Sequence, residues 1–485
     1  MKKIKYLFAL IAIAQTLLIT SCDSDFQEVN TNSNDPSTVS ANLLLAGTLR
    51  STANTVQSIF LAGEAGSCWV QHLGKPVYNT NEMYVPRQNS IEALWDTMYS
   101  SVLKDADEMQ DLAISEGNTA LEGVALVVKT YAYSVLTDSF GNIPMSQALA
   151  ATEGNITPAY DDSRTEVYPA MLAMLDEAIM KLDGPGTIDA SQDIVYGGNA
   201  AAWKKYASSL KFRILMRSSG SAANPADNVG SQLNDLLLAG NLFSSNADDA
   251  KVTYLSAAPN ANPYYEGLVD GGRSAEWCMG EELVNYMINT GDGRLPVYAQ
   301  EVGGDGSGNG YVGKPAGIAD IGNSIYGDSN NVSLIGTKYL EAEQPAFFMT
   351  YAQLNFLMAE ATERGLLTVG DTAANYYAAG ITASFEANGV AVGGFDTSYA
   401  TGAAGLDQIA RQSWVALFLQ GYESWAEYRR TGFTNDLPLA IDAQESAIPS
   451  RLNYPLSQQS LNNANYTEAV SNQGADVLTS SLWWN

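Results

Sequence analysis

Apolar residues recur at helical spacing through most of the chain. In residues 91–112, for example, Leu94, Trp95, Met98 and Val102 fall one, three or four positions apart, as expected for one face of a helix. The same spacing predicts helices at 119–136, 166–182, 200–217, 351–364, 373–387 and 407–428, and a first helix starting near Ala41. Strand patterns are short, and the best are residues 251–255 and 346–350. The pattern therefore predicts a mainly α protein.

Two pairs of the expected helices are joined by short links. Residues 91–112 pair with 119–136, and 351–364 pair with 373–387 across a link that contains Gly365. Short links favour antiparallel helical hairpins, as in tetratricopeptide-like scaffolds. No self-similar 34-residue period accompanies them, so the prediction rests on the pairing of helices and not on a repeat.

Between these hairpins the composition changes. Residues 219–275 and 300–346 are dense in Gly, Asn, Ser, Asp and Pro, and the region 219–346 is expected to form loop-rich insertions. An earlier segment, 66–90, has a similar character and carries several aromatic residues. Long loops inside a compact domain are usually functional. A helical scaffold with aromatic loops predicts a ligand-binding surface.

Charge narrows the choice of partner. The 485-residue chain has 25 Lys and Arg against 53 Asp and Glu, a net charge of −28. Such a field repels phosphate backbones and anionic headgroups, so nucleic acid is excluded as an expected partner. Apolar residues make up 46% of the chain, which is enough for a substantial core. Membrane association must then come from something other than a basic face.

The N-terminal sequence offers such an anchor. Three lysines in the first five residues precede an apolar run of about residues 6–19, and Ile19-Thr20-Ser21-Cys22 follows. This arrangement is typical of a secretory signal and is similar to a bacterial lipobox, with Cys22 as the lipidated residue. An ordinary signal with a chance cysteine is the alternative. We expect a signal peptide at 1–21, a polar tether at 22–40 and a single domain at 41–485.

Cysteine and histidine are scarce beyond Cys22. Cys68 and Cys278 could form a disulfide or remain buried free thiols. His72 is the single histidine, which argues against a His-rich metal site and makes a Ser-His-Asp triad improbable.

Several segments carry recognisable motifs. They are LTDSFGNIPMSQAL (136–149), AAWKKYASSLKFRILMR (201–217), TYAQLNFLMAEATERG (350–365), YYAAGITASFEANG (376–389), IARQSWVALFLQGYESWAEYRRTGF (409–433), IPSRLNYPLSQQSLNNANY (448–466) and GADVLTSSLWWN (474–485). In number and order these segments resemble the SusD/RagB family, specifically its second SusD-like branch. The resemblance covers nearly the whole mature chain.

That resemblance implies a SusD-like helical fold and a non-enzymatic lipoprotein of the Bacteroidetes outer membrane. Such a protein faces the cell exterior and works with a SusC-type, TonB-dependent transporter. Its ligand is usually an oligosaccharide and in some cases an oligopeptide. No cofactor or metal is expected.

The motif residues themselves are interpreted as structural. Gly141 is expected to adopt a positive φ at a helix end, and Asp138 to act there as a cap. Gly421 is expected to admit a close neighbour, and Glu427 to form ion pairs with Arg429 and Arg430.

The ligand is expected to contact the loops instead. Aromatic side chains can stack on the CH faces of sugar rings, and arginine can bind their hydroxyls. The candidate contact residues are Trp69, Tyr78, Tyr84, Arg87, Tyr264, Tyr265, Arg273 and Tyr311. Because the family site has no fixed motif, only Cys22 is assigned directly from the resemblance.

Two other patterns point to different functions. Asp305-Gly306-Ser307-Gly308-Asn309-Gly310 opens like a calcium loop, but its twelfth position is Ala316 and not the required Glu. Adjacent acids such as Asp161-Asp162 or Glu281-Glu282 could belong to a glycosidase, although 53 acidic residues produce such neighbours by chance. A secreted glycoside hydrolase and an adhesin therefore remain as alternatives.

Overall fold

The computed structural model describes residues 40–150, 154–221, 228–432 and 437–485. Ala41–Asn485 forms one compact unit, and all that follows concerns its described residues. Cys22 and the predicted signal peptide lie outside the described residues.

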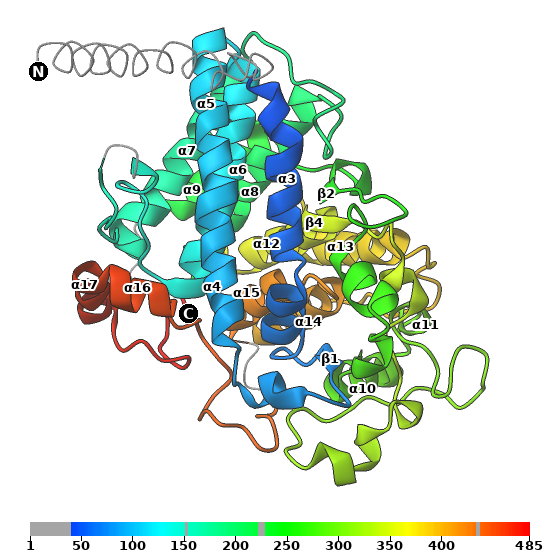
Figure 1. The fold of residues 1–485 in the computed structure, drawn as a ribbon. Helices are drawn as coiled ribbons and strands as arrows, with labels where there is room; N and C mark the ends of the chain where they lie inside the picture. The colour runs from blue at the N-terminus through cyan, green and yellow to red at the C-terminus, as the bar shows by residue number, and fades with distance from the viewer. Residues whose placement is uncertain (1–39, 151–153, 222–227, 433–436) are drawn as a thin grey trace, which may run out of the picture. The chain divides into compact units, whose positions relative to one another are not determined.

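The first half of this unit is a layer of helices, of which α3, α5 and α6 run side by side (Figure 1). Its helices are α3 (Asn42–Val56), α4 (Gln88–Thr97), α5 (Lys104–Glu116), α6 (Thr119–Phe140), α7 (Tyr168–Lys181), α8 (Ala200–Ser218) and α9 (Val229–Leu238). A π-helical turn, η3 (Met98–Leu103), connects α4 to α5. The predicted helix at 91–112 is therefore present and continues beyond both ends.

Helix α6 lies at the centre of the layer. Nearly all of its side chains are buried, as expected for a helix that is apolar on every face. Asn118 caps its start by accepting a hydrogen bond from the backbone N–H of Leu121. Its end is Gly141, whose φ of +89° confirms the predicted turn.

The second half contains α12 (Tyr351–Glu363), α13 (Ala373–Ala387), α14 (Ala403–Ala416) and α15 (Gly421–Thr431). Helices α12 and α13 form the predicted hairpin, and Gly380 of α13 leaves room for the ring of Phe356 on α12. Helices α16 (Leu456–Leu461) and α17 (Asn463–Gln473) follow near the C-terminus (Figure 1).

The prediction of one helix over 407–428 is wrong, because the chain breaks between α14 and α15. Leu419 adopts a left-handed φ of +56° in this break. The break lets α15 pack against the π-helical segment η1 (Ile59–Ser67). A Cβ at Gly421 would overlap the carbonyl oxygen of Ala62, so the close approach expected at Gly421 is confirmed.

Both predicted strands exist, and they pair with each other. β2 (Ala250–Val252) is antiparallel to β4 (Ala346–Met349), with Lys251 opposite Phe347. A second pair, β1 (Leu73–Gly74) with β3 (Cys278–Met279), was not expected from the sequence. The strands are few and short, so the mainly α class is confirmed.

The loop-rich region contains more local structure than its composition indicated. It includes α10 (Glu281–Thr290) and α11 (Leu295–Tyr298). Its short helical turns include η6 (Asn246–Asp248), η7 (Tyr265–Asp270), η8 (Ser274–Glu276) and η12 (Thr337–Leu340). Within the described ranges, no helix is both long and apolar enough to span a bilayer.

Candidate functional site

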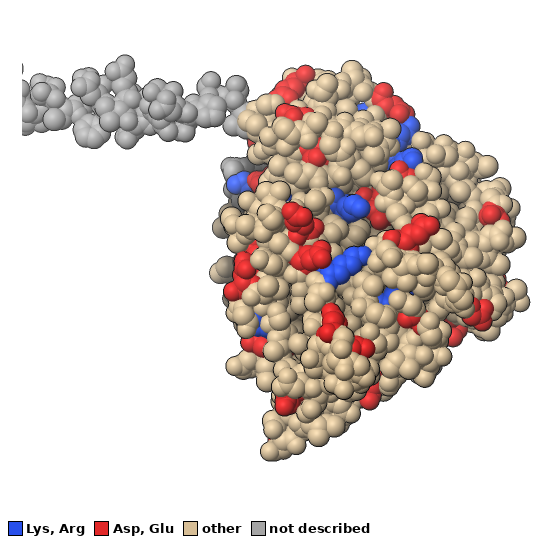
Figure 2. Space-filling view, turned by 90° about the vertical axis from the view of Figure 1, so that its right-hand side faces the viewer, with Lys and Arg blue, Asp and Glu red and all other residues tan. Residues whose placement is uncertain are grey.

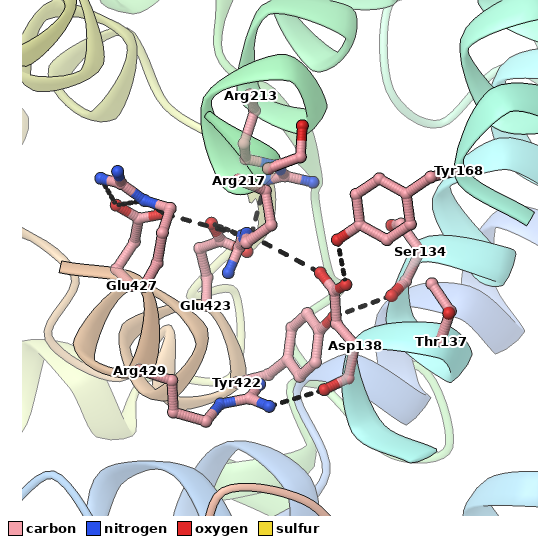
Figure 3. A network of polar contacts seen from close by, with 12 residues as sticks. Ser134, Thr137, Asp138, Tyr168, Arg213, Arg217, Tyr422, Glu423, Glu427 and Arg429 are labelled. Carbon is pink, nitrogen blue, oxygen red and sulfur yellow. Dashed lines mark hydrogen bonds and ion pairs between the residues drawn. The ribbon is translucent and has the colours of Figure 1, made fainter. Parts of the chain in front are cut away.

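A network of buried charges lies where α6, α8 and α15 meet (Figure 3). Arg217 of α8 donates from Nη2 to Oε1 of Glu423 on α15 at 2.5 Å. Its guanidinium also lies 3.8 Å from the Asp138 carboxylate on α6 and 3.7 Å from that of Glu427. The hydroxyl of Tyr168 donates to Asp138 at 2.6 Å. Three of the sequence motifs thus converge on one ionic cluster.

The cluster extends to α12 through Arg430. Its Nη2 lies 2.7 Å from Glu427 Oε2 and 2.5 Å from Glu360 Oε2, and Arg364 binds Glu360 at 2.8 Å. The expected ion pair between Glu427 and Arg430 is therefore confirmed. These contacts join α12 to α15 in the interior.

Arg429 behaves differently from the expectation. It donates to the backbone carbonyls of Asp138 at 2.7 Å and Ser450 at 2.9 Å, and it stacks on the ring of Trp425 at 3.7 Å. Burial lowers the pKa of Arg429 to about 10. Trp484 lies against the same guanidinium at 4.8 Å, which ties the C-terminal motif to the cluster.

The cluster is structural and not a ligand site. Asp138, expected to cap a helix, instead binds Tyr168 and lies beside Arg217, and burial raises its pKa. The arginine and carboxylate side chains named above are buried except for Arg364. Buried ion pairs of this kind can hold elements in a fixed register, and these join α6, α8, α12 and α15.

A second ionic cluster reaches the surface around Glu64 of η1. Glu64 is 2% exposed and binds Lys75 at 2.8 Å, while Arg87 Nη2 also donates to it. Arg273 donates twice to Glu276 Oε2, at 2.7 and 3.0 Å. The hydrogen bond to Glu276 raises the pKa of Arg273, and Glu64 and Tyr78 add to this effect.

Tyr78 is the exposed aromatic residue of this cluster, which we call the Glu64 rim: Glu64, Lys75, Tyr78, Arg87, Arg273 and Glu276. Its side chain is 71% exposed, and its backbone has a left-handed φ of +54°. Non-glycine residues in this conformation cost free energy and concentrate at functional sites. Arg87 and Arg273 are about half exposed beside it. The rim can stack a ring on Tyr78 and offer two guanidinium groups to hydroxyls.

Three predicted contact residues are buried instead. Trp69 is fully enclosed, donates to the carbonyl of Asn81 at 3.0 Å and packs edge-on against Trp425. Tyr84 is buried, with its hydroxyl accepting from the backbone N–H of Ala440 at 3.1 Å, and burial raises its pKa to about 12. Tyr264 is enclosed beside Trp277. Their assignment to an exposed ligand surface is corrected, because each ring is used in core packing.

The other two aromatic candidates, Tyr265 and Tyr311, are partly exposed, and within the described ranges they form no hydrogen bond, ion pair or ring contact with a rim residue. Tyr265 begins η7, and its hydrogen bond and charge interaction with Asp270 raise its pKa. Tyr311 packs against the core in another loop. The structure thus gathers Tyr78, Arg87 and Arg273, and Tyr264 is buried nearby, beside Trp277 and close enough for the Glu64 charge to act on it.

Four parts of the rim region were not predicted from the sequence: Glu64, Lys75, Glu276 and the supporting ring of Trp277. Lys75 Nζ lies 4.7 Å from that ring. One signal was available, because Glu64 is the single charged residue in the apolar run Ile59–Trp69. A charge within such a run must find a partner when it is buried.

The cysteines, the histidine and the acidic residue Asp161 have structural surroundings. Cys68 and Cys278 are buried free thiols, so the possible disulfide does not form. His72 is enclosed against Trp414 and Phe418, and burial lowers its pKa to about 3. Asp161 accepts hydrogen bonds from Met145 and Ser146. Among the residues that the structure describes, no group of three His, Cys, Asp or Glu side chains could hold a metal ion.

The chain belongs to the SusD-like family. The family model described as "Starch-binding associating with outer membrane", the second SusD-like branch, matches residues 33–455. This confirms the resemblance that the motifs indicated. A comparison with curated proteins finds no match.

Solved structures show the same fold. A chitin-binding protein is 24% identical with a TM-score of 0.78, over 92% of this chain and 99% of that one. A chitin-binding SusD homolog from Flavobacterium johnsoniae is 23% identical with a TM-score of 0.76, over 91% and 98%. A SusD homolog from Bacteroides uniformis is 24% identical with a TM-score of 0.78, over 91% and 99%. The SusD-like helical fold is therefore established.

Proposed function

We propose that this protein is a non-enzymatic, surface-exposed lipoprotein that captures oligosaccharides at the Glu64 rim and delivers them to a SusC-type, TonB-dependent outer-membrane transporter. Membership of a family described as starch-binding and associated with the outer membrane supports the glycan class. The chitin-binding activity attributed to two similar structures points the same way.

The choice of the Glu64 rim as the binding site rests on the exposure of Tyr78. Tyr78 exposes 71% of its side chain although its backbone is held in a left-handed conformation. The neighbouring Asn79 anchors the turn by donating to the carbonyl of Ile318 at 2.6 Å. An anchored turn keeps the position of this residue fixed, so less backbone entropy is lost when a sugar stacks on its ring.

The carboxylates that bind the two rim arginines also support glycan capture at this site. Glu64 holds Arg87, and Glu276 holds Arg273, so both guanidinium groups are oriented before a ligand arrives. Each guanidinium keeps further N–H groups for hydroxyl oxygens. An uncharged glycan is also free of the repulsion that a net charge of −28 exerts on anions.

Binding without turnover tests the proposal. The purified protein is incubated with chitooligosaccharides and with maltooligosaccharides, and each sugar is then analysed by chromatography. We expect at least one series to bind and to be recovered unchanged. Shortened products would contradict the proposal and favour a hydrolase. Binding of oligopeptides and of neither sugar series would favour the oligopeptide alternative.

Lipidation and the transporter partner need a separate test. We expect Cys22→Ala to release the protein from outer membranes, because lipid chains at this residue are the proposed anchor. The wild-type protein is expected to co-purify with a large β-barrel from the same membranes. Continued membrane attachment of the variant would contradict lipidation, and purification without a barrel would favour an adhesin.

A further inference from the structure

A pocket of about 200 Å³ lies between the β2–β4 pair, η12 and the end of α13. It shares no lining residue with the Glu64 rim. Its volume exceeds the roughly 150 Å³ of a cavity that holds benzene in an apolar core. The pocket can therefore admit a group the size of a single ring.

Two lysines line this pocket. Lys251 of β2 stacks its ammonium 5.8 Å from the ring of Phe347 on β4, and Lys338 of η12 donates to the carbonyl of Ala387 at 2.9 Å. Neither forms an ion pair with any carboxylate in the described part of the chain. Acidic side chains outnumber basic ones on the face of the molecule that Figure 2 shows. Two unpaired lysines in one pocket are unusual in so acidic a protein.

Polar groups and aromatic rings complete the lining. Gln344 and Gln420 are half-buried there, and neither side-chain amide has a hydrogen-bond partner among the described residues. Asn388 accepts from the hydroxyl of Tyr339 at 2.6 Å and is already fixed. Phe418 packs edge-on against Tyr339 at 4.9 Å and forms an apolar wall. A few free polar groups beside apolar walls are typical of a small-ligand site.

The acidic neighbours do not neutralise both lysines. Asp249 lines the pocket and accepts from the backbone N–H of Tyr351 at 2.7 Å, and burial raises its pKa to about 7. Partial burial lowers the pKa of Lys338, and the nearby Glu341 carboxylate opposes this shift. No salt bridge of the described residues joins Lys251 or Lys338 to a carboxylate, so both ammonium groups are available to an anion.

We propose that this pocket binds a carboxylate carried on one sugar-sized ring, that is, a single uronic acid residue. The ammonium groups of Lys251 and Lys338 bind the carboxylate, and Gln344 and Gln420 bind ring hydroxyls. The ring packs against Phe347 and Phe418. This site is independent of glycan capture at the Glu64 rim and would extend the ligand range of the protein to acidic glycans.

The test compares D-glucuronate with D-glucose by titration calorimetry at low ionic strength, because the two sugars share a ring and differ in the carboxylate. We expect a Kd for glucuronate at least about tenfold lower than that for glucose. Bulk electrostatics predicts the opposite order, since the net charge of −28 repels an anion. The comparison needs no variant, so it cannot fail through misfolding.

Single substitutions then locate the site. Lys251→Gln and Lys338→Gln should each weaken glucuronate binding by about fivefold or more, because each removes a charge-assisted hydrogen bond. Lys104→Gln on α5 makes the same change of charge outside the pocket and should leave the Kd unchanged within about twofold.

Several results would overturn the proposal. They are equal binding of both sugars, no glucuronate binding up to about 10 mM, binding of acetate as tight as that of glucuronate, and an equal loss in Lys104→Gln. Binding of neutral oligosaccharides without glucuronate would reject this pocket and leave the proposed function at the Glu64 rim intact.

Discussion

The buried cluster around Arg217 and the Glu64 rim use the same side-chain types in opposite ways. In the buried cluster, Arg217 and Arg430 are 3% exposed, and their carboxylate partners are enclosed with them. In the rim, Glu64 is buried, but the guanidinium groups of Arg87 and Arg273 are about half exposed. The sequence motifs of the family build the first region, whereas the rim lies outside them. The family motifs and the proposed ligand site thus consist of different residues.

The largest effect should come from breaking the buried cluster. Glu423→Gln removes the carboxylate that lies closest to Arg217 and so weakens the charge balance of the buried cluster, which should lower the free energy of unfolding by about 3–5 kcal/mol. Chemical denaturation measures this. The exposed Glu343→Gln is the control and should change stability by less than about 0.5 kcal/mol. A loss below about 1 kcal/mol in Glu423→Gln would mean that the cluster does not hold the helices together.

A somewhat smaller loss is expected where α15 meets η1. Gly421→Ala places a methyl group against the Ala62 carbonyl and should cost about 1–3 kcal/mol of stability. Gly47→Ala on α3 is the matched control, because nothing lies within 4 Å of its Cβ and alanine favours helix. Thermal unfolding of both variants distinguishes steric overlap from a general effect of the substitution. Equal stability in the two variants would contradict the close packing.

The pH dependence of the free energy of unfolding should report on the burial of His72. Its pKa is about 3 in the folded protein against 6.5 in the unfolded chain. Above pH 6.5 both states are neutral; as the pH falls below 6.5, the unfolded chain binds the proton first and folding loses stability. Burial of Asp249 has the opposite effect on stability, because it raises the pKa of this group from 3.8 to about 7. Between these two pH values the folded state gains stability from Asp249 as the pH falls.

Comparing the stability of wild type with that of His72→Phe cancels the contributions of Asp249 and the other titratable groups, because both proteins contain them. Between about pH 6 and pH 4, wild type should lose about 1.4 kcal/mol more per pH unit than the variant. Denaturant midpoints across this range measure the difference. Parallel curves would show that His72 is accessible to protons in the folded state.

Periodicity predicted the regular elements well because helical spacing reports directly on burial. Helix α13 has the predicted bounds, and the two predicted strands, β2 and β4, pair with each other. The break at Leu419 was not predictable in this way, since residues on both sides of it keep an apolar helical pattern. The contact between Gly421 and η1 decides the break, and such a contact lies outside the local sequence.

The candidate site was predicted less well, for a related reason. Irregular segments have no period, so their composition does not tell which aromatic ring is buried. Trp69 and Tyr78 belong to the same segment, yet one is enclosed and the other is 71% exposed. Tertiary contacts with Trp425 separate them. Glu64 binds Arg87 and Glu276 binds Arg273, and the separation of Glu64 from Arg87 in sequence gives no sign of their contact.

The most direct measurement of the central claim uses Tyr78, where the smallest effect on stability is expected. Tyr78→Ala should change the free energy of unfolding by less than about 0.5 kcal/mol, because the side chain is mostly solvated. Affinity electrophoresis through gels containing soluble starch or glycol chitin should show retarded wild-type protein and an unretarded variant. Retardation of Tyr78→Ala equal to that of wild type would contradict glycan capture at the Glu64 rim.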